Sequence, residues 1–214
     1  MFGMADKDPY AWTILTIGHL SMNKHWGETE RKRGPLCTCT LVRTPDGLLI
    51  VDPSLQPPEM PKLLMDQAGV LPEEVRHVFV THFHGDHRFG LDAFPHAAWW
   101  MAPEETEYWK PKVTGPEAIH LGRFRPAVPG FLPGLRPVLT PGHTPGTTSL
   151  FFEWRKQRVA IAGDAVMTAD FLRAREGFHN STNPEMARTS IDLVVRDADI
   201  IIPGHDNYIT RDLL

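Results

Sequence analysis

The stretch that decides the fold is THFHGDH, residues 81–87. Four of its seven residues are metal ligands by type: His82, His84, Asp86 and His87. Imidazole nitrogen and carboxylate oxygen suit zinc at neutral pH. The preceding run VRHVFV, residues 75–80, is short and apolar, which predicts a buried strand. The cluster would then lie where a strand ends and a loop begins, which is where sites are built in open α/β architectures.

The spacing of the ligands predicts two binding positions. In an extended loop His82 and His84 point to the same side, because side chains alternate with a period of two, so they can chelate one ion. Gly85 lets the chain turn tightly, so that Asp86 and His87 can face a second ion beside the first. A set of surface loop histidines is the alternative interpretation.

Three later segments count against that alternative, because each follows an apolar run and places a further ligand just past the expected end of a strand. The segments are TPGHTPG with His143, AGDA with Asp164 and IPGHD with His205.

The order HxHxDH, PGHTPG, AGDA and PGHD resembles the metallo-β-lactamase superfamily of binuclear metallohydrolases. The pattern covers residues 81–206, more than half of the chain, and LLIVDPS at residues 48–54 resembles the early strand of that family, which ends in an aspartate. The alternation of elements alone predicts an α/β protein. The resemblance implies a four-layer αββα sandwich of two mixed sheets with external helices, as a single domain over residues 1–214.

The resemblance also implies a ligand set for two zinc ions, with iron or manganese as alternatives. The first ion would be held by His82, His84 and His143, and the second by Asp86, His87 and His205, with Asp164 bridging both. Asp86 would also be catalytic, orienting the hydroxide that bridges the metals.

The reaction implied is hydrolysis of a small ester, thioester or lactone by that hydroxide, with β-lactams as weak substrates. Departures from known subfamilies narrow the substrate. Classical β-lactamases of the superfamily lack an aspartate at the position of Asp164. Acyl-homoserine lactonases carry a tyrosine where this chain has Met167. Glyoxalase II enzymes carry a C-terminal helical domain, whereas nine residues follow His205 here.

Two alternatives use the same motifs for other chemistry. The first is a nuclease or phosphodiesterase with the same dimetal site, because THFHGDHRFGL is locally similar to the transfer-RNA 3′-processing nucleases. Their later motifs differ, and this chain is not basic. The second is an iron oxidoreductase similar to persulfide dioxygenases, with His82, His143 and Asp164 as a two-histidine, one-carboxylate set. His84 counts against the flavodiiron branch, which usually has glutamate there.

Composition gives no general electrostatic attraction to nucleic acid. The 214 residues are 42% hydrophobic and 22% charged, with a formal net charge of −4, so we expect no nucleic-acid partner. The N-terminus has no basic region followed by a long apolar stretch, and no run approaches a membrane span. We therefore expect no signal peptide, no membrane association and a cytoplasmic protein. Cys37 and Cys39 are too close for an unstrained disulfide and are interpreted as buried thiols.

Residues 165–182 are the expected wall of the substrate pocket, because they leave directly from the bridging aspartate. They mix Met167, Phe171 and Phe178 with two arginines, a composition typical of a ligand cleft. The segment is interpreted as a helical or loop lid. In the alternative interpretation, Phe171 and Phe178 simply cover the sheet as scaffold.

The opposite wall is expected from the polar loop at residues 21–35, with Trp26 as its substrate-binding residue. The same loop carries the basic run Arg31, Lys32 and Arg33. This run is either a solvated loop or an anion-binding lip of the pocket.

The rest of the pattern predicts a conventional set of elements. Strands are expected at residues 12–20, 37–43, 48–51, 97–101, 147–153, 158–161 and 200–202, and helices at 58–68, 88–94, 103–109 and 183–198. The segment at 110–137 is rich in proline and glycine and predicts no regular element; its His120 is expected at the surface.

Overall fold

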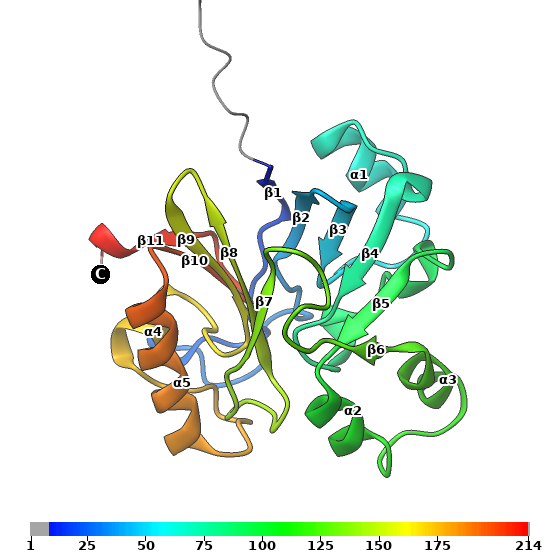
Figure 1. Cartoon of the computed structure of the whole chain (residues 1–214). Coiled ribbons are helices and arrows are strands. Elements are labelled where there is room, and N and C mark those ends of the chain that lie inside the picture. Colours follow the sequence, from blue (N-terminus) through cyan, green and yellow to red (C-terminus); the bar gives the residue numbers. More distant parts are fainter. Residues whose placement is uncertain (1–8, 214) are drawn as a thin grey trace, which may run out of the picture.

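The structure is a computed structural model, and it describes residues 9–213. Residues 1–8, which carry much of the expectation about a signal peptide, lie outside the described residues. Two mixed β-sheets face one another and helices cover their outer faces (Figure 1). This is the predicted αββα arrangement.

The first sheet has six strands in the order β1-β2-β3-β4-β5-β6. The first three strands pair antiparallel and the last four pair parallel. Gly47 has a φ of 120°, which glycine readily adopts, and lies at the turn between β2 and β3. The strands are β1 Ala11–Thr16, β2 Cys39–Thr44, β3 Gly47–Val51, β4 Val75–Phe79, β5 Ala98–Met101 and β6 Arg125–Pro126.

The second sheet has five strands in the order β11-β10-β9-β8-β7. Its one parallel pair, β9 and β10, requires a crossover, and the segment that crosses over carries two helices. The strands are β7 Arg136–Leu139, β8 Thr148–Trp154, β9 Gln157–Gly163, β10 Ile200–Pro203 and β11 Ile209–Thr210.

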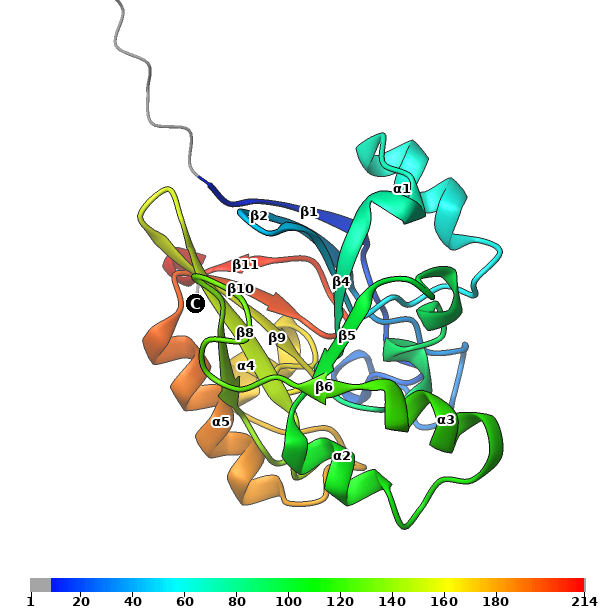
Figure 2. The same cartoon turned by 45° about the vertical axis from the view of Figure 1, so that its right-hand side comes forward.

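Helices cover the two outer faces, as Figures 1 and 2 show. The helices α1 Met60–Ala68, α2 Pro103–Trp109 and α3 Gly115–Arg123 lie on the side of the first sheet, and α4 Ala169–Ala174 and α5 Pro184–Asp197 on the side of the second. Helix α5 begins as predicted, because the Asn183 side chain accepts a hydrogen bond of 3.0 Å from the Met186 backbone N–H. Among the described residues, no helix is both long and apolar enough to cross a membrane.

Alternation along the strands separates the apolar layers. On β3, Leu49 and Val51 face the other sheet, while Ile50 faces the outer helices. Trp99 and Trp100 likewise point to opposite faces of β5. Because both faces of the strands are buried, the polar ligands can gather only where the strands end.

The structure corrects three predictions of elements. Residues 88–94 are not an α-helix, because the Gly90 N–H binds the carbonyl of Pro53 at 2.9 Å and only a 3-10 turn forms, at Leu91–Ala93. The strand predicted at 12–20 ends at Thr16, where its pairing with β2 shifts register. Helix α3 was missed within the proline-rich segment.

Candidate metal centre

All seven predicted ligands come together at one edge of the sandwich. They arrive on four loops, each at the end of a strand, as the sequence predicts. His82, His84, Asp86 and His87 follow β4, His143 lies between β7 and β8, Asp164 follows β9, and His205 follows β10.

The first group is three imidazoles and a carboxylate. The Nδ1 of His84 lies 2.9 Å from the Nε2 of His82 and 2.8 Å from the Nε2 of His143. The Oδ2 of Asp164 lies 3.2 Å from the Nε2 of His143 and 3.7 Å from that of His82. A tetrahedral zinc with bonds of about 2.0–2.1 Å would separate its ligands by about 3.3–3.4 Å, so these spacings fit one ion.

The second group, Asp86, His87 and His205, has its ligand atoms within 4.8 Å of one another. The other oxygen of Asp164, Oδ1, lies 3.2 Å from the Nε2 of His87 and 3.3 Å from the Nε2 of His205. Within residues 9–213, His87 Nε2 and Asp164 Oδ1 are buried without a hydrogen-bond partner. Buried polar atoms are rarely left so, and a bound cation would satisfy both.

The protonation states of the first group also suit a metal. Burial lowers the pKa of His82 and His84 below its usual value and that of His143 to about 4, so these rings are neutral at pH 7 and their lone pairs are available. Burial alone would raise the pKa of Asp164, but the positive charge of the facing histidines, led by His205 and His87, lowers it well below its usual value.

A second layer of hydrogen bonds fixes the ligands. Asp52 accepts hydrogen bonds from the backbone and hydroxyl of Thr81, both at 2.8 Å, and its Oδ2 lies 2.9 Å from the Nδ1 of His87. The Nδ1 of His205 lies 2.8 Å from the carbonyl of Leu36. Each contact leaves the Nε2 of its histidine facing the site. Asp52 is the aspartate that ends the early strand LLIVDPS.

Glu105, in α2, was missed as a functional residue because the sequence suggests only an acid in the first turn of a helix. Its side chain is buried, and it accepts from the Phe83 N–H at 2.9 Å and the Trp109 indole at 2.7 Å. It also accepts from the Thr144 hydroxyl at 2.6 Å and the Gly146 N–H at 3.2 Å. One carboxylate therefore ties the loop of His82 and His84 to the loop of His143.

Gly204 lies against the shared aspartate. A Cβ at this position would come within 2.0 Å of the Asp164 Oδ1, so no side chain fits between β10 and the carboxylate. The sequence shows this requirement only as the glycine of PGHD.

A cavity of about 230 Å³ opens over the metal ligands. His84, His143, Asp164 and His205 lie at its base with Asp86.

The predicted wall residues occupy different places around this cavity. Met167 and Phe178 line the cavity, together with Leu20 from the loop that follows β1. Phe171 is 1% exposed, packs against Phe178, and lies outside the lining. Trp26 is 64% exposed, also outside the lining, and donates its indole N–H to Asp170 at 2.9 Å.

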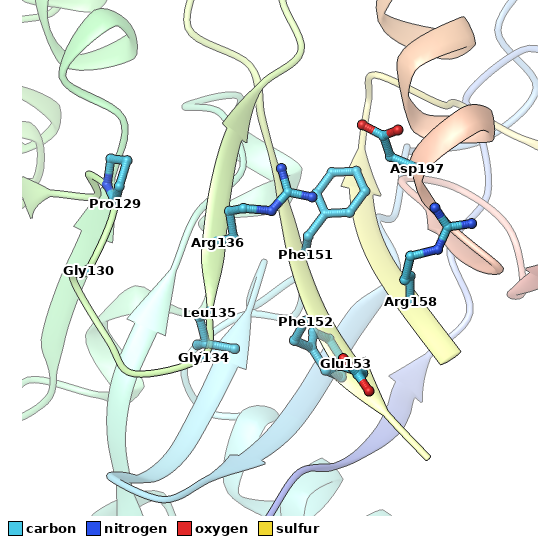
Figure 3. A pocket seen from close by; sticks show the side chains of 10 residues that line it. All are labelled: Pro129, Gly130, Gly134, Leu135, Arg136, Phe151, Phe152, Glu153, Arg158 and Asp197. Atoms are coloured by element: carbon cyan, nitrogen blue, oxygen red, sulfur yellow. The ribbon is translucent and has the colours of Figure 1, made fainter. Parts of the chain in front are cut away.

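A second cavity, of about 410 Å³, lies away from the ligands, beside β7, β8 and β9 (Figure 3). The guanidinium of Arg136 lies over the ring of Phe151, 4.8 Å from its centre. Arg158 forms an ion pair with Asp199, which is not among the lining residues. No residue lining this cavity belongs to either ligand group. Of these two cavities, only the smaller is lined by candidate ligands.

The fold and the motifs match known proteins. The model of the metallo-beta-lactamase superfamily matches residues 33–205. The structure is similar to that of an N-acyl homoserine lactone hydrolase solved with the product N-hexanoyl-L-homoserine at its catalytic metal centre, with 24% identity over 95% of this chain and 94% of that one and a TM-score of 0.68.

Two further structures show the same fold. AidC, a dizinc quorum-quenching lactonase, is 18% identical over 79% of this chain and 72% of its own, with a TM-score of 0.67. A candidate metallo-beta-lactamase from Thermotoga maritima is 18% identical over 94% of this chain and 99% of its own, with a TM-score of 0.69. None of the curated protein sequences matches significantly. The family model covers more than half of the chain, and the chain therefore belongs to the metallo-beta-lactamase superfamily.

Proposed function

We propose that this protein is a dizinc hydrolase of small esters, thioesters or lactones. The observation that carries the proposal is the position of Asp164, whose two carboxylate oxygens each face a separate group of histidines. A carboxylate so placed is suited to hold two cations side by side. The second group also favours a dimetal hydrolase over a single-iron oxygenase, which would need only one group.

Each candidate ligand has a proposed role. His82, His84 and His143 would hold the first zinc, Asp86, His87 and His205 the second, and Asp164 both. Two such ions would supply a water that is acidic near neutral pH and a Lewis acid for the substrate carbonyl. Asp86 lines the cavity, with its Oδ2 3.6 Å from the Nε2 of His205, and its carboxylate would also orient the attacking water.

The test is a substrate panel on protein reconstituted with zinc. Thioesters, aryl esters and lactones of short acyl chains should be hydrolysed, with product release independent of oxygen. Turnover confined to phosphodiesters, or oxygen uptake with a persulfide and bound iron, would contradict the proposal and support one of the two alternatives.

Substitution of the two phenylalanines in the proposed wall at residues 165–182 should have different effects. Phe178 lines the cavity, so Phe178→Ala should change KM or the ranking of substrates while the metal content stays near that of the wild type. Phe171 is buried beneath it, so Phe171→Ala should cost about 3–5 kcal/mol of stability. Thermal unfolding and steady-state kinetics of both variants check this. An unchanged substrate ranking in Phe178→Ala would show that the segment is scaffold, as would destabilisation of both variants alike.

A further inference from the structure

We infer that Arg31 binds an anionic group of the substrate at the mouth of the metal cavity, so that the substrate is an acyl compound bearing a carboxylate or phosphate. Arg31 lines the cavity together with Asn180 from the facing segment. Both side chains are exposed, so a ligand can reach them. This inference rests on the proposed hydrolase function and specifies its substrate.

The other two cations of the basic run have structural partners. Lys32 forms an ion pair with Glu30 at 2.6 Å, and its backbone N–H binds the carbonyl of Ser21 at 2.9 Å. Arg33 forms an ion pair with Glu28 and donates to the Leu20 carbonyl at 3.0 Å. The loop is thus fixed immediately after Arg31.

Arg31 itself has no ion pair within residues 9–213. Four other cations in the same loop, the facing segment and the loop after β4 do have ion-pair partners: Lys24 with Glu176, Arg173 with Asp170, Arg175 with Asp192 and Arg88 with Glu117. Arg31 therefore follows a backbone position set by its neighbours, and its exposed guanidinium forms no ion pair within the described fold.

The charge of the cavity as a whole favours an anion. Two divalent ions would bring four positive charges to its base, against two negative charges from Asp86 and Asp164 and one from the attacking hydroxide, so the base would stay positive. Adding Arg31 extends this positive potential to the mouth. A cleft of one sign concentrates ligands of the opposite sign and accelerates their binding.

The remaining lining defines the rest of the ligand. Leu20, Met167 and Phe178 form an apolar surface suited to a short hydrocarbon chain. The cavity, at about 230 Å³, is smaller than the roughly 300–1,000 Å³ typical of sites for drug-sized ligands. A short acyl chain with its reacting carbonyl at the metals and an anion at Arg31 fits these features. Guanidinium can bind carboxylate or phosphate through paired charge-assisted hydrogen bonds.

The test begins with binding to the zinc-loaded protein, measured by calorimetry without turnover. Glutarate and valerate have the same chain length, and only glutarate has a second carboxylate. Glutarate should bind about tenfold more tightly to the wild type, and Arg31→Gln should remove that preference. Lys32→Gln is the control. It removes a neighbouring charge that is already paired with Glu30, so this variant should still prefer glutarate over valerate. 4-Phosphonobutyrate replaces the second carboxylate of glutarate with a phosphonate, which stands in for phosphate. If it binds more tightly than glutarate, the site is selective for phosphate; if glutarate binds more tightly, the site is selective for carboxylate.

Hydrolysis of the glutaryl and valeryl thioesters of N-acetylcysteamine then separates this inference from the proposed function. Arg31→Gln should reduce the ratio of kcat/KM for the glutaryl over the valeryl compound by about tenfold. Equal affinities for both acids in the wild type would overturn the inference, as would a preference that survives Arg31→Gln. A preference abolished by Arg31→Gln without turnover of any ester would support the anion site and contradict the hydrolase.

Discussion

Replacing Asp164 by Asn should reduce kcat by about a thousandfold or more while the protein remains folded. The two oxygens of Asp164 face the two ligand groups at 3.2–3.7 Å, and asparagine keeps the shape of the side chain but loses the charge. One ion should bind weakly or be lost, and with it several kcal/mol of stabilisation of the transition state. A thousandfold loss corresponds to about 4 kcal/mol.

The measurement combines steady-state kinetics, metal content and circular dichroism on the same preparation. Asp192→Asn is the matched control, because Asp192 is exposed on α5 and pairs with Arg175. The control should retain both metals and normal turnover. If folded Asp164→Asn hydrolyses the substrate at nearly the wild-type rate, Asp164 does not bridge the metals.

Replacing Glu105 by Ala should destabilise the fold more than any change at the surface. The carboxylate accepts four hydrogen bonds at 2.6–3.2 Å from two ligand-bearing loops and the indole of Trp109. The variant leaves these donors buried without an acceptor, at about 1–3 kcal/mol for each one that water cannot reach. We expect a loss of about 3–5 kcal/mol, together with weaker metal binding, because the loops of His82 and His143 separate.

Chemical denaturation of the chelator-treated and zinc-loaded forms separates the effects on folding and on metal affinity. Glu104→Ala is the control: the neighbouring side chain is exposed, so its loss should change stability by no more than about 0.5 kcal/mol. Equal midpoints for Glu105→Ala and the wild type in both forms would refute the role assigned to Glu105.

The sequence predicts which seven side chains come together, because the pattern that marks these candidate ligands is local. Each of the four loops that carry them follows an apolar run, and the runs become strands that end at one edge of the sandwich. Hydrophobic alternation and turn residues similarly mark β2, β3 and their turn, and the Asn183 cap marks the start of α5. These features depend on neighbours in the chain, so the chain alone specifies them.

What the sequence does not show depends on contacts between distant segments. Glu105 becomes buried only because two loops fold over α2. Residues 88–94 do not form the predicted helix, because the Gly90 N–H donates to the distant carbonyl of Pro53. Arg31 is distinguished from Lys32 and Arg33 by ion pairs that the basic run does not reveal. Trp26, predicted as a pocket wall, instead binds Asp170 outside the cavity lining.

The dimetal site is tested most directly by elemental analysis of protein purified without a metal-affinity tag. Two groups of ligands sharing Asp164 predict close to two equivalents of transition metal per chain, with zinc predominant. Removal of the metal by a chelator should abolish hydrolysis, and two equivalents of zinc should restore it. Full activity in protein shown to contain no metal would contradict the account.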